Sequence, residues 1–139
     1  MRYLDTCICV EFLRGRLREG YSELRAAKPG SFALPAIVVA ELHYGAQHSA
    51  NPEKDLRLVE AFTSAFGIVA FDEACAKEYG RLRQELAAAG SPIGDRDTMI
   101  AAMALANRAT VVTDNFKDFR RVSGLQLEVW AEVDFREGG

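Results

Sequence analysis

Five carboxylates stand where the sequence changes from an apolar segment to a turn or a helix, or inside an apolar run. Asp5 ends the first apolar segment, Glu41 interrupts a long apolar run, and Asp97 follows a Pro-Ile-Gly turn. Asp114 and Asp118 follow a further apolar segment. Hard divalent cations such as Mg²⁺ take oxygen ligands, and a few fixed carboxylates are enough to hold one. The chemistry favoured by these residues is therefore Mg²⁺-dependent hydrolysis of phosphodiesters.

Each acid also has a structural explanation, and these explanations differ in strength. Asp5 would serve as the N-cap of a helix over residues 8–13. Asp97, with Asp95 as the cap, would be a first-turn acid that interacts favourably with the helix dipole. Glu41 is different because its apolar neighbours predict burial, and an unpaired buried carboxylate is strongly unfavourable. Glu41 therefore predicts a cationic partner, either an arginine or a metal ion.

Two threonines adjoin the strand-end positions. The hydroxyls of Thr6 and Thr113 are candidates for orienting ligands or waters, and ordinary strand or cap roles fit the spacing equally well. The sequence contains no phosphate-binding glycine-rich loop and no Ser-His-Asp set. It therefore favours water, and no protein side chain, as the nucleophile.

The remaining aromatic and imidazole side chains have weaker functional indications. His43 and His48 are five residues apart, which is a poor fit to one helical face and favours solvent or core positions for both. Tyr44, Phe12 and Tyr79 are candidates for stacking on bases. Aromatic residues at helical spacing more often belong to the core.

Short apolar segments alternate with segments of helical periodicity along the chain. Strands are expected over residues 2–5, 32–34, 68–71, 110–112 and 125–130. Helices are expected over 8–13, 16–27, 36–47, from 51 to a stop at 67, from a cap at 72 to 90, and over 95–107. This alternation predicts an α/β fold with a mainly parallel central sheet covered on both faces. Ligands on such sheets bind outside the carboxyl ends of the strands, where Asp5 and Asp114 fall.

Composition limits the class of protein. With 139 residues, 49% of them apolar, the chain suits one globular domain. Its apolar runs are far shorter than the ~20 residues of a membrane span, and Asp5 falls where a secretory signal would be apolar. We therefore expect a cytoplasmic protein that does not contact a membrane. Three cysteines without CxxC spacing and two histidines support neither a disulfide framework nor a zinc site, so the thiols are expected to be reduced and partly buried.

The net charge of −3 argues against a protein that coats nucleic acid by bulk electrostatics. Local basic surfaces remain available, because arginines occur in three clusters. These clusters are candidates for phosphate contacts or for ordinary solvated helix faces. They are Arg14, Arg16 and Arg18; Arg81 and Arg83; and Arg120 and Arg121.

Seven short segments occur in a recognisable order and spacing: Tyr-Leu-Asp-Thr at 3–6, Phe-Leu-Arg-Gly at 12–15, Ala-Glu-Leu-His-Tyr-Gly at 40–45, Tyr-Gly-Arg-Leu-Arg at 79–83, Pro-Ile-Gly-Asp-Arg-Asp at 92–97, Ile-Ala-Ala at 100–102 and Val-Val-Thr-Asp-Asn at 111–115. Together they resemble the PIN-domain family, and more narrowly the VapC-type toxins of bacterial toxin–antitoxin pairs. The resemblance continues through 121–125 and 127–130, and so covers nearly the whole chain.

The resemblance implies an α/β/α sandwich, with a PIN-like ribonuclease domain over residues 1–135 and a C-terminal tail over 136–139. It also implies an endoribonuclease dependent on Mg²⁺ or Mn²⁺, whose products carry 5′-phosphate and 3′-hydroxyl ends. The expected partners are an RNA substrate and a small VapB-like antitoxin, and the expected assembly is a homodimer.

The family's acidic positions match Asp5, Glu41 and Asp97, and Asp114 is the fourth expected catalytic residue. Asp5 and Asp97 are the expected metal ligands, directly or through water. Glu41 would complete the acidic site, and Asp114 would support the ion or its waters.

Two positions depart from the family pattern. Cys7 stands where the family commonly has Asn after the Asp-Thr pair, and Asn115 stands where many members have the last acid. Asp114, Asn115 and Asp118 are therefore alternative occupants of the fourth position. A non-catalytic module that binds RNA or sequesters the antitoxin is one rival reading. A phosphatase with Asp5 as nucleophile is another, although Cys7 replaces the second acid of its usual DxD pattern.

Overall fold

Five parallel strands form the centre of the structure, a computed structural model that describes residues 1–17, 20–28 and 30–130. The strands are β1 (Arg2–Leu4), β2 (Phe32–Pro35), β3 (Gly67–Val69), β4 (Thr110–Thr113) and β5 (Gln126–Val129). They lie in the order β3-β2-β1-β4-β5, and every neighbouring pair is parallel. The carboxyl ends of all the strands therefore lie at one edge of the sheet. The predicted parallel sheet is confirmed.

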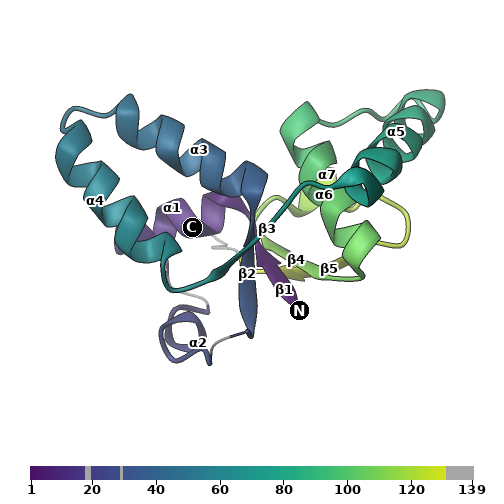
Figure 1. The fold of residues 1–139 in the computed structure, drawn as a ribbon. Coiled ribbons are helices and arrows are strands. Elements are labelled where there is room, and N and C mark those ends of the chain that lie inside the picture. The colour runs from purple at the N-terminus through teal and green to yellow at the C-terminus, as the bar shows by residue number, and fades with distance from the viewer. Residues whose placement is uncertain (18–19, 29, 131–139) are drawn as a thin grey trace, which may run out of the picture.

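Helices cover both faces of this sheet (Figure 1). On one face lie α1 (Thr6–Leu13), α2 (Tyr21–Arg25), α3 (Ala36–Gln47) and α4 (Pro52–Thr63). On the other lie α5 (Glu73–Ala88), α6 (Asp95–Asn107) and α7 (Phe116–Phe119). Parallel crossovers are right-handed, so the chain changes faces when the strand order reverses after β3. The predicted α/β/α layering is confirmed.

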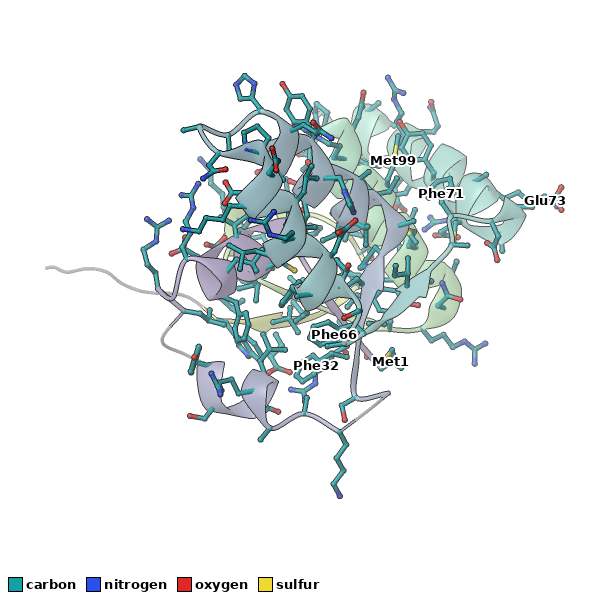
Figure 2. All side chains as sticks on the ribbon, turned by 60° about the vertical axis from the view of Figure 1, so that its left-hand side comes forward. Met1, Phe32, Phe66, Phe71, Glu73 and Met99 are labelled. Carbon is teal, nitrogen blue, oxygen red and sulfur yellow. The ribbon has the colours of Figure 1, made fainter. Side chains whose placement is uncertain are left out.

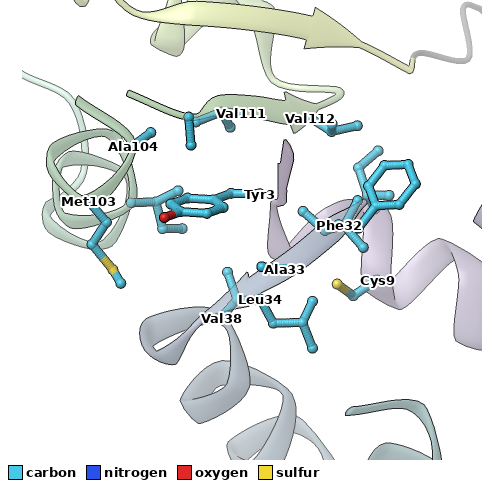
Figure 3. Packing of buried hydrophobic residues seen from close by; sticks show 14 of the residues in the cluster. Tyr3, Cys9, Phe32, Ala33, Leu34, Val38, Met103, Ala104, Val111 and Val112 are labelled. Carbon is cyan, nitrogen blue, oxygen red and sulfur yellow. The ribbon is translucent and has the colours of Figure 1, made fainter. Parts of the chain in front are cut away.

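The core is formed by apolar side chains on both faces of the central strands. Figure 3 shows Tyr3 of β1 turned toward Met103 and Ala104 of α6. Phe32 of β2 lies on the other side of the sheet, near Cys9 of α1. All five residues are buried. Burial on both faces explains why consecutive residues in the middle of the sheet, such as Tyr3 and Leu4 or Val111 and Val112, are apolar and do not alternate with polar residues.

At the edges of the molecule, Phe66 and Glu73 show the separation of partly buried apolar and exposed charged side chains. Figure 2 shows Phe66 turned inward beneath α4, and it packs against the core. Glu73, at the start of α5, points away into solvent. The predicted N-cap of α5 is confirmed, because the side chain of Asp72 accepts a hydrogen bond from the Cys75 backbone N–H at 3.1 Å.

Two helices differ from the prediction. The segment 16–27 was expected to be helical, but among its described residues only those of α2, which starts after Gly20, form a helix. Gly20 has a φ of 75°, and a Cβ there would lie 2.4 Å from the Trp130 ring, so this position requires glycine and a turn. The second difference is α7, which the sequence did not predict because a four-residue helix carries no periodic signal.

The predicted domain boundary at 135 and the tail over 136–139 lie outside the described residues. Among the helices that the structure does describe, none has the length and hydropathy needed to span a membrane.

Candidate active site

Asp5 follows β1 in the middle of the sheet and is 5% exposed. Its Oδ1 accepts a hydrogen bond from the Thr6 backbone N–H at 2.8 Å, so Asp5 caps α1 as predicted. Its Oδ2 accepts hydrogen bonds from the Thr113 hydroxyl at 2.6 Å and the Cys7 thiol at 3.4 Å. Burial raises the pKa of Asp5 above its ordinary value, and the hydrogen bonds from these three residues oppose that shift.

Thr113 connects the two central strands at their carboxyl ends. The Asp5 backbone N–H donates to the Val112 carbonyl at 2.9 Å, which places Asp5 beside the end of β4. The Thr113 hydroxyl donates to Asp5 and accepts from the Asn115 backbone N–H at 2.9 Å. The hydroxyl therefore orients the Asp5 carboxylate and the loop after β4.

Glu41 lies in the second turn of α3, where Val38 and Leu42 beside it are buried. Its Oε1 accepts a hydrogen bond from the Thr6 hydroxyl, and its Oε2 lies 3.0 Å from Nη1 of Arg96. The predicted cationic partner of Glu41 is therefore an arginine in this structure. Sequence reasoning did not identify Arg96 as this partner, although its position between two first-turn aspartates was a usable signal.

Asp97 lies in the first turn of α6 and is half-buried. The N-cap of this helix is Gly94, so the expectation that Asp95 caps it is wrong. Asp95 is exposed, whereas Asp97 faces the other acids. Burial, followed by the charges of Asp5 and other nearby acids, raises the pKa of Asp97 to about 6.

The three candidates for the fourth acidic position occupy different places. Asp114 and Asn115 line the same pocket as the other acids, while Asp118 lies behind Asn115. The Asn115 side-chain amide donates to Asp97 Oδ2 at 3.3 Å and to Asp118 Oδ2 at 3.2 Å. Asn115 therefore holds Asp97 in place, and Asp114 is the acid of this loop that reaches the pocket.

Cys7 contributes a neutral thiol to the site. Burial, and then the charge of Asp5, raises its pKa well above the ordinary value. A thiol in this environment is a poor nucleophile. Cys7, Cys9 and Cys75 are all free, and each is buried or partly buried, as expected.

An open pocket of about 520 Å³ gathers these residues at the carboxyl edge of the sheet. We call it the acid pocket, and it is lined by Asp5, Thr6, Cys7, Glu41, Asp97, Asp114 and Asn115. All four predicted catalytic residues are among them.

The acid pocket suits a hydrated divalent cation. No three or more His, Cys, Asp or Glu side chains within the described ranges are close enough together to enclose a metal ion. Mg²⁺ keeps several water ligands and binds proteins through one or two carboxylates, so it does not need such a cage. The raised pKa of Asp97, caused in part by neighbouring acids, marks negative charge that a cation would compensate.

The sequence and fold of this chain have counterparts among known proteins. The family model described as the PIN domain matches residues 2–125. The chain belongs to the PIN-domain family. The match spans every element from β1 to α7.

Several relatives in this family are named VapC. The chain is 40% identical over 128 residues to "Ribonuclease VapC2" of Rickettsia felis, covering 91% of this chain and 96% of the relative. It is 35% identical over 131 residues to "tRNA(fMet)-specific endonuclease VapC" of Shigella flexneri, covering 92% and 96%. The resemblance to VapC-type toxins is confirmed, and with it the assignment to the ribonucleases.

Solved structures agree with this assignment. A chain in the crystal structure of VapBC2 from Rickettsia felis bound to a promoter DNA fragment superposes with a TM-score of 0.87 at 39% identity, covering 94% of this chain and all of that one. A chain of DNA-bound VapBC from Salmonella typhimurium gives 0.88 at 34% identity, covering 94% and 98%.

Proposed function

We propose that this chain is an endoribonuclease dependent on Mg²⁺, or on Mn²⁺ in its place, and is the toxin of a VapBC-type pair. The observation that carries the proposal is the meeting of Asp5, Glu41, Asp97 and Asp114 in one pocket at the carboxyl edge of the sheet. The names of its relatives support RNA as the substrate.

Asp5 and Asp97 are the residues that hold the cation, directly or through water. Glu41 completes the acidic site, and Asp114 supports the ion or its waters. When bound, a divalent cation polarises the phosphoryl group and makes a water more acidic. Thr113 and Thr6 keep Asp5 and Glu41 in fixed orientations, so the carboxylates need little rearrangement during the reaction.

The reaction is hydrolysis of one phosphodiester bond. Water adds its oxygen to phosphorus, the bond from phosphorus to the 3′ oxygen breaks, and that oxygen takes up a proton. The products carry a 5′-phosphate and a 3′-hydroxyl. The transfer RNA named for the Shigella flexneri relative, tRNA(fMet), is the first substrate to test.

A VapB-like antitoxin is the proposed protein partner, and the complex would bind DNA as the two VapBC structures do. The ion pair between Arg96 and Glu41 supports inhibition by a cationic side chain, because a guanidinium already fits beside the pocket acids. The expected homodimer remains a prediction.

The test is RNA cleavage by Asp5→Asn and Asp97→Asn, with and without Mg²⁺. Asp95→Asn is the matched control, because it makes the same change in the first turn of α6 at an exposed position. We expect the first two variants to stay folded and to lose most of their cleavage and growth toxicity. The control should keep both, because a first-turn acid contributes only about 0.3–1 kcal/mol to helix stability.

Three outcomes would contradict the proposal. Full cleavage by folded Asp97→Asn or Asp5→Asn would remove that residue from the metal site. Binding of RNA without cleavage would favour the non-catalytic module. Hydrolysis of a small phosphomonoester, with RNA left intact, would favour the phosphatase.

A further inference from the structure

An exposed pair of stacked rings lies at the C-terminal end of α3, where Tyr44 is in the helix and His48 is its C-cap. The Tyr44 and His48 rings are separated by 5.6 Å between centroids, with 11° between their planes. This is an offset-stacked arrangement. Tyr44 is 65% exposed, and His48 is also exposed.

This pair lies on the same side of α3 as Glu41, which lines the acid pocket. Glu41, Tyr44 and His48 are three and four residues apart along α3, which places them within an arc of about 60° on the helix. Tyr44 lies about 4.5 Å beyond Glu41 along the axis, and His48 about 10.5 Å beyond it. The helix starts at the carboxyl edge of the sheet, so these rings lead outward from the pocket.

The other aromatic candidates for base stacking have structural roles. Phe12 packs against Tyr21 and Phe62, with ring centroids 5.3 and 5.4 Å away. Tyr79 is half-buried and packs edge-on against Phe71. Tyr44 differs from Phe12 and Tyr79, because the ring stacked on it is itself exposed.

We propose that Tyr44 and His48 form a stacking platform for the bases of single-stranded RNA that leaves the acid pocket, an inference that rests on the proposed function. Successive bases of a stacked strand are about 3.4 Å apart, so the platform lies about one to three nucleotides from Glu41. Bases stack on aromatic rings regardless of sequence.

The surroundings of the platform favour RNA over an apolar peptide segment. Ala40, Gly45 and Gln47 are the neighbouring exposed residues of α3, and none of them has a large apolar side chain. A peptide helix docking there would need a continuous apolar surface. A base needs only an accessible ring face, which Tyr44 provides.

The first measurement is equilibrium binding of a short fluorescently labelled single-stranded RNA, with EDTA present to stop metal-dependent cleavage. Tyr44→Ala should bind at least about ten-fold more weakly than the parent, and His48→Ala should show a smaller loss. Tyr44→Phe should bind like the parent because it keeps the ring. Ile68→Ala removes an exposed apolar side chain from β3 and should also leave binding unchanged.

The second measurement is cleavage kinetics with Mg²⁺. A platform binds substrate and transition state equally, so Tyr44→Ala should raise KM and leave kcat unchanged. Binding of the antitoxin should be the same for the parent and Tyr44→Ala.

The proposal is overturned if Tyr44→Ala binds and cleaves RNA like the parent, or if Tyr44→Phe is as impaired as Tyr44→Ala. It is also overturned if Tyr44→Ala weakens antitoxin binding and leaves RNA binding intact, since the occupant would then be the peptide. Failure of the proposed function gives a different result, because the parent itself would then cleave no RNA.

Discussion

Arg96 on α6 forms an ion pair with Glu41 on α3, with 3.0 Å between Nη1 and Oε2. The Arg96 side chain is 69% exposed, whereas that of Glu41 is 20% exposed. Within this pair the cation is exposed to solvent, and the carboxylate is largely shielded from it. A guanidinium stays protonated at any ordinary pH, so Arg96 competes with a metal ion for the charge of Glu41.

Arg96→Gln should therefore increase the affinity for Mg²⁺ or Mn²⁺ several-fold. The metal-free protein should lose only about 0.2–1 kcal/mol of stability, because the Arg96 side of the pair is largely solvent-exposed. Titration calorimetry with Mn²⁺ measures the affinity. Arg81→Gln is the matched control, since it removes the same charge from an exposed ion pair with Glu78 on α5. Equal or weaker metal binding by Arg96→Gln would show that the arginine does not compete.

The stability of the metal-free protein should fall as the pH rises from about 4 to about 6. The pKa of Asp97 is about 6 in the folded protein against an ordinary 3.8, so over this interval the folded state binds more protons than the unfolded state. The burial of Asp5 acts in the same direction. The loss attributed to Asp97 is on the order of 1–2 kcal/mol after allowance for solvent screening.

Urea unfolding at several pH values, in EDTA, checks this slope. Asp97→Asn should flatten it and should be more stable than the parent near pH 7, whereas Asp95→Asn should retain it. An unchanged slope in Asp97→Asn would assign the pH dependence to other groups.

Thr113→Val should destabilise the protein and weaken metal binding together. The substitution keeps the shape of a fully buried side chain but removes the hydroxyl that bonds to Asp5 and to the Asn115 backbone. Leaving these polar groups without a partner costs about 1–3 kcal/mol. Thr113→Ser keeps the hydroxyl and should preserve the metal affinity. If Ser and Val bind metal equally well, the hydroxyl does not position Asp5.

Charge reversal at Arg14 and Arg120 should weaken RNA binding and leave the cleavage position unchanged. Neither forms an ion pair within the described part of the chain, whereas Arg16 is paired with Glu11 at 2.7 Å. Removing one phosphate-binding arginine should reduce the slope of log K against log salt by about 0.7. Arg16→Glu should have a smaller effect. If the Arg14 and Arg120 double variant binds as tightly as the parent at every salt concentration, these side chains are ordinary solvated residues.

The sequence was sufficient to predict the acids of the site but not the side chains that support them. Asp5 follows β1 and Thr113 ends β4, and a parallel sheet brings strand ends together, so their proximity was predictable. The contacts of Arg96 and the Asn115 amide depend on how α3, α6 and the loop after β4 lie in space. No local pattern encodes those distances. The turn at Gly20 was missed for the same reason, because the Trp130 ring that excludes a side chain there is 110 residues away.

The position of β1 between β2 and β4 has a consequence during protein synthesis. Thr113, the partner of Asp5, belongs to β4, so a nascent chain that ends at residue 109 contains Asp5, Glu41 and Asp97 but lacks one of the two strands beside β1. Domains fold as units once their distant pairings become available. A truncated translation product should therefore be harmless to the cell, and toxicity should begin only when most of the chain has been made.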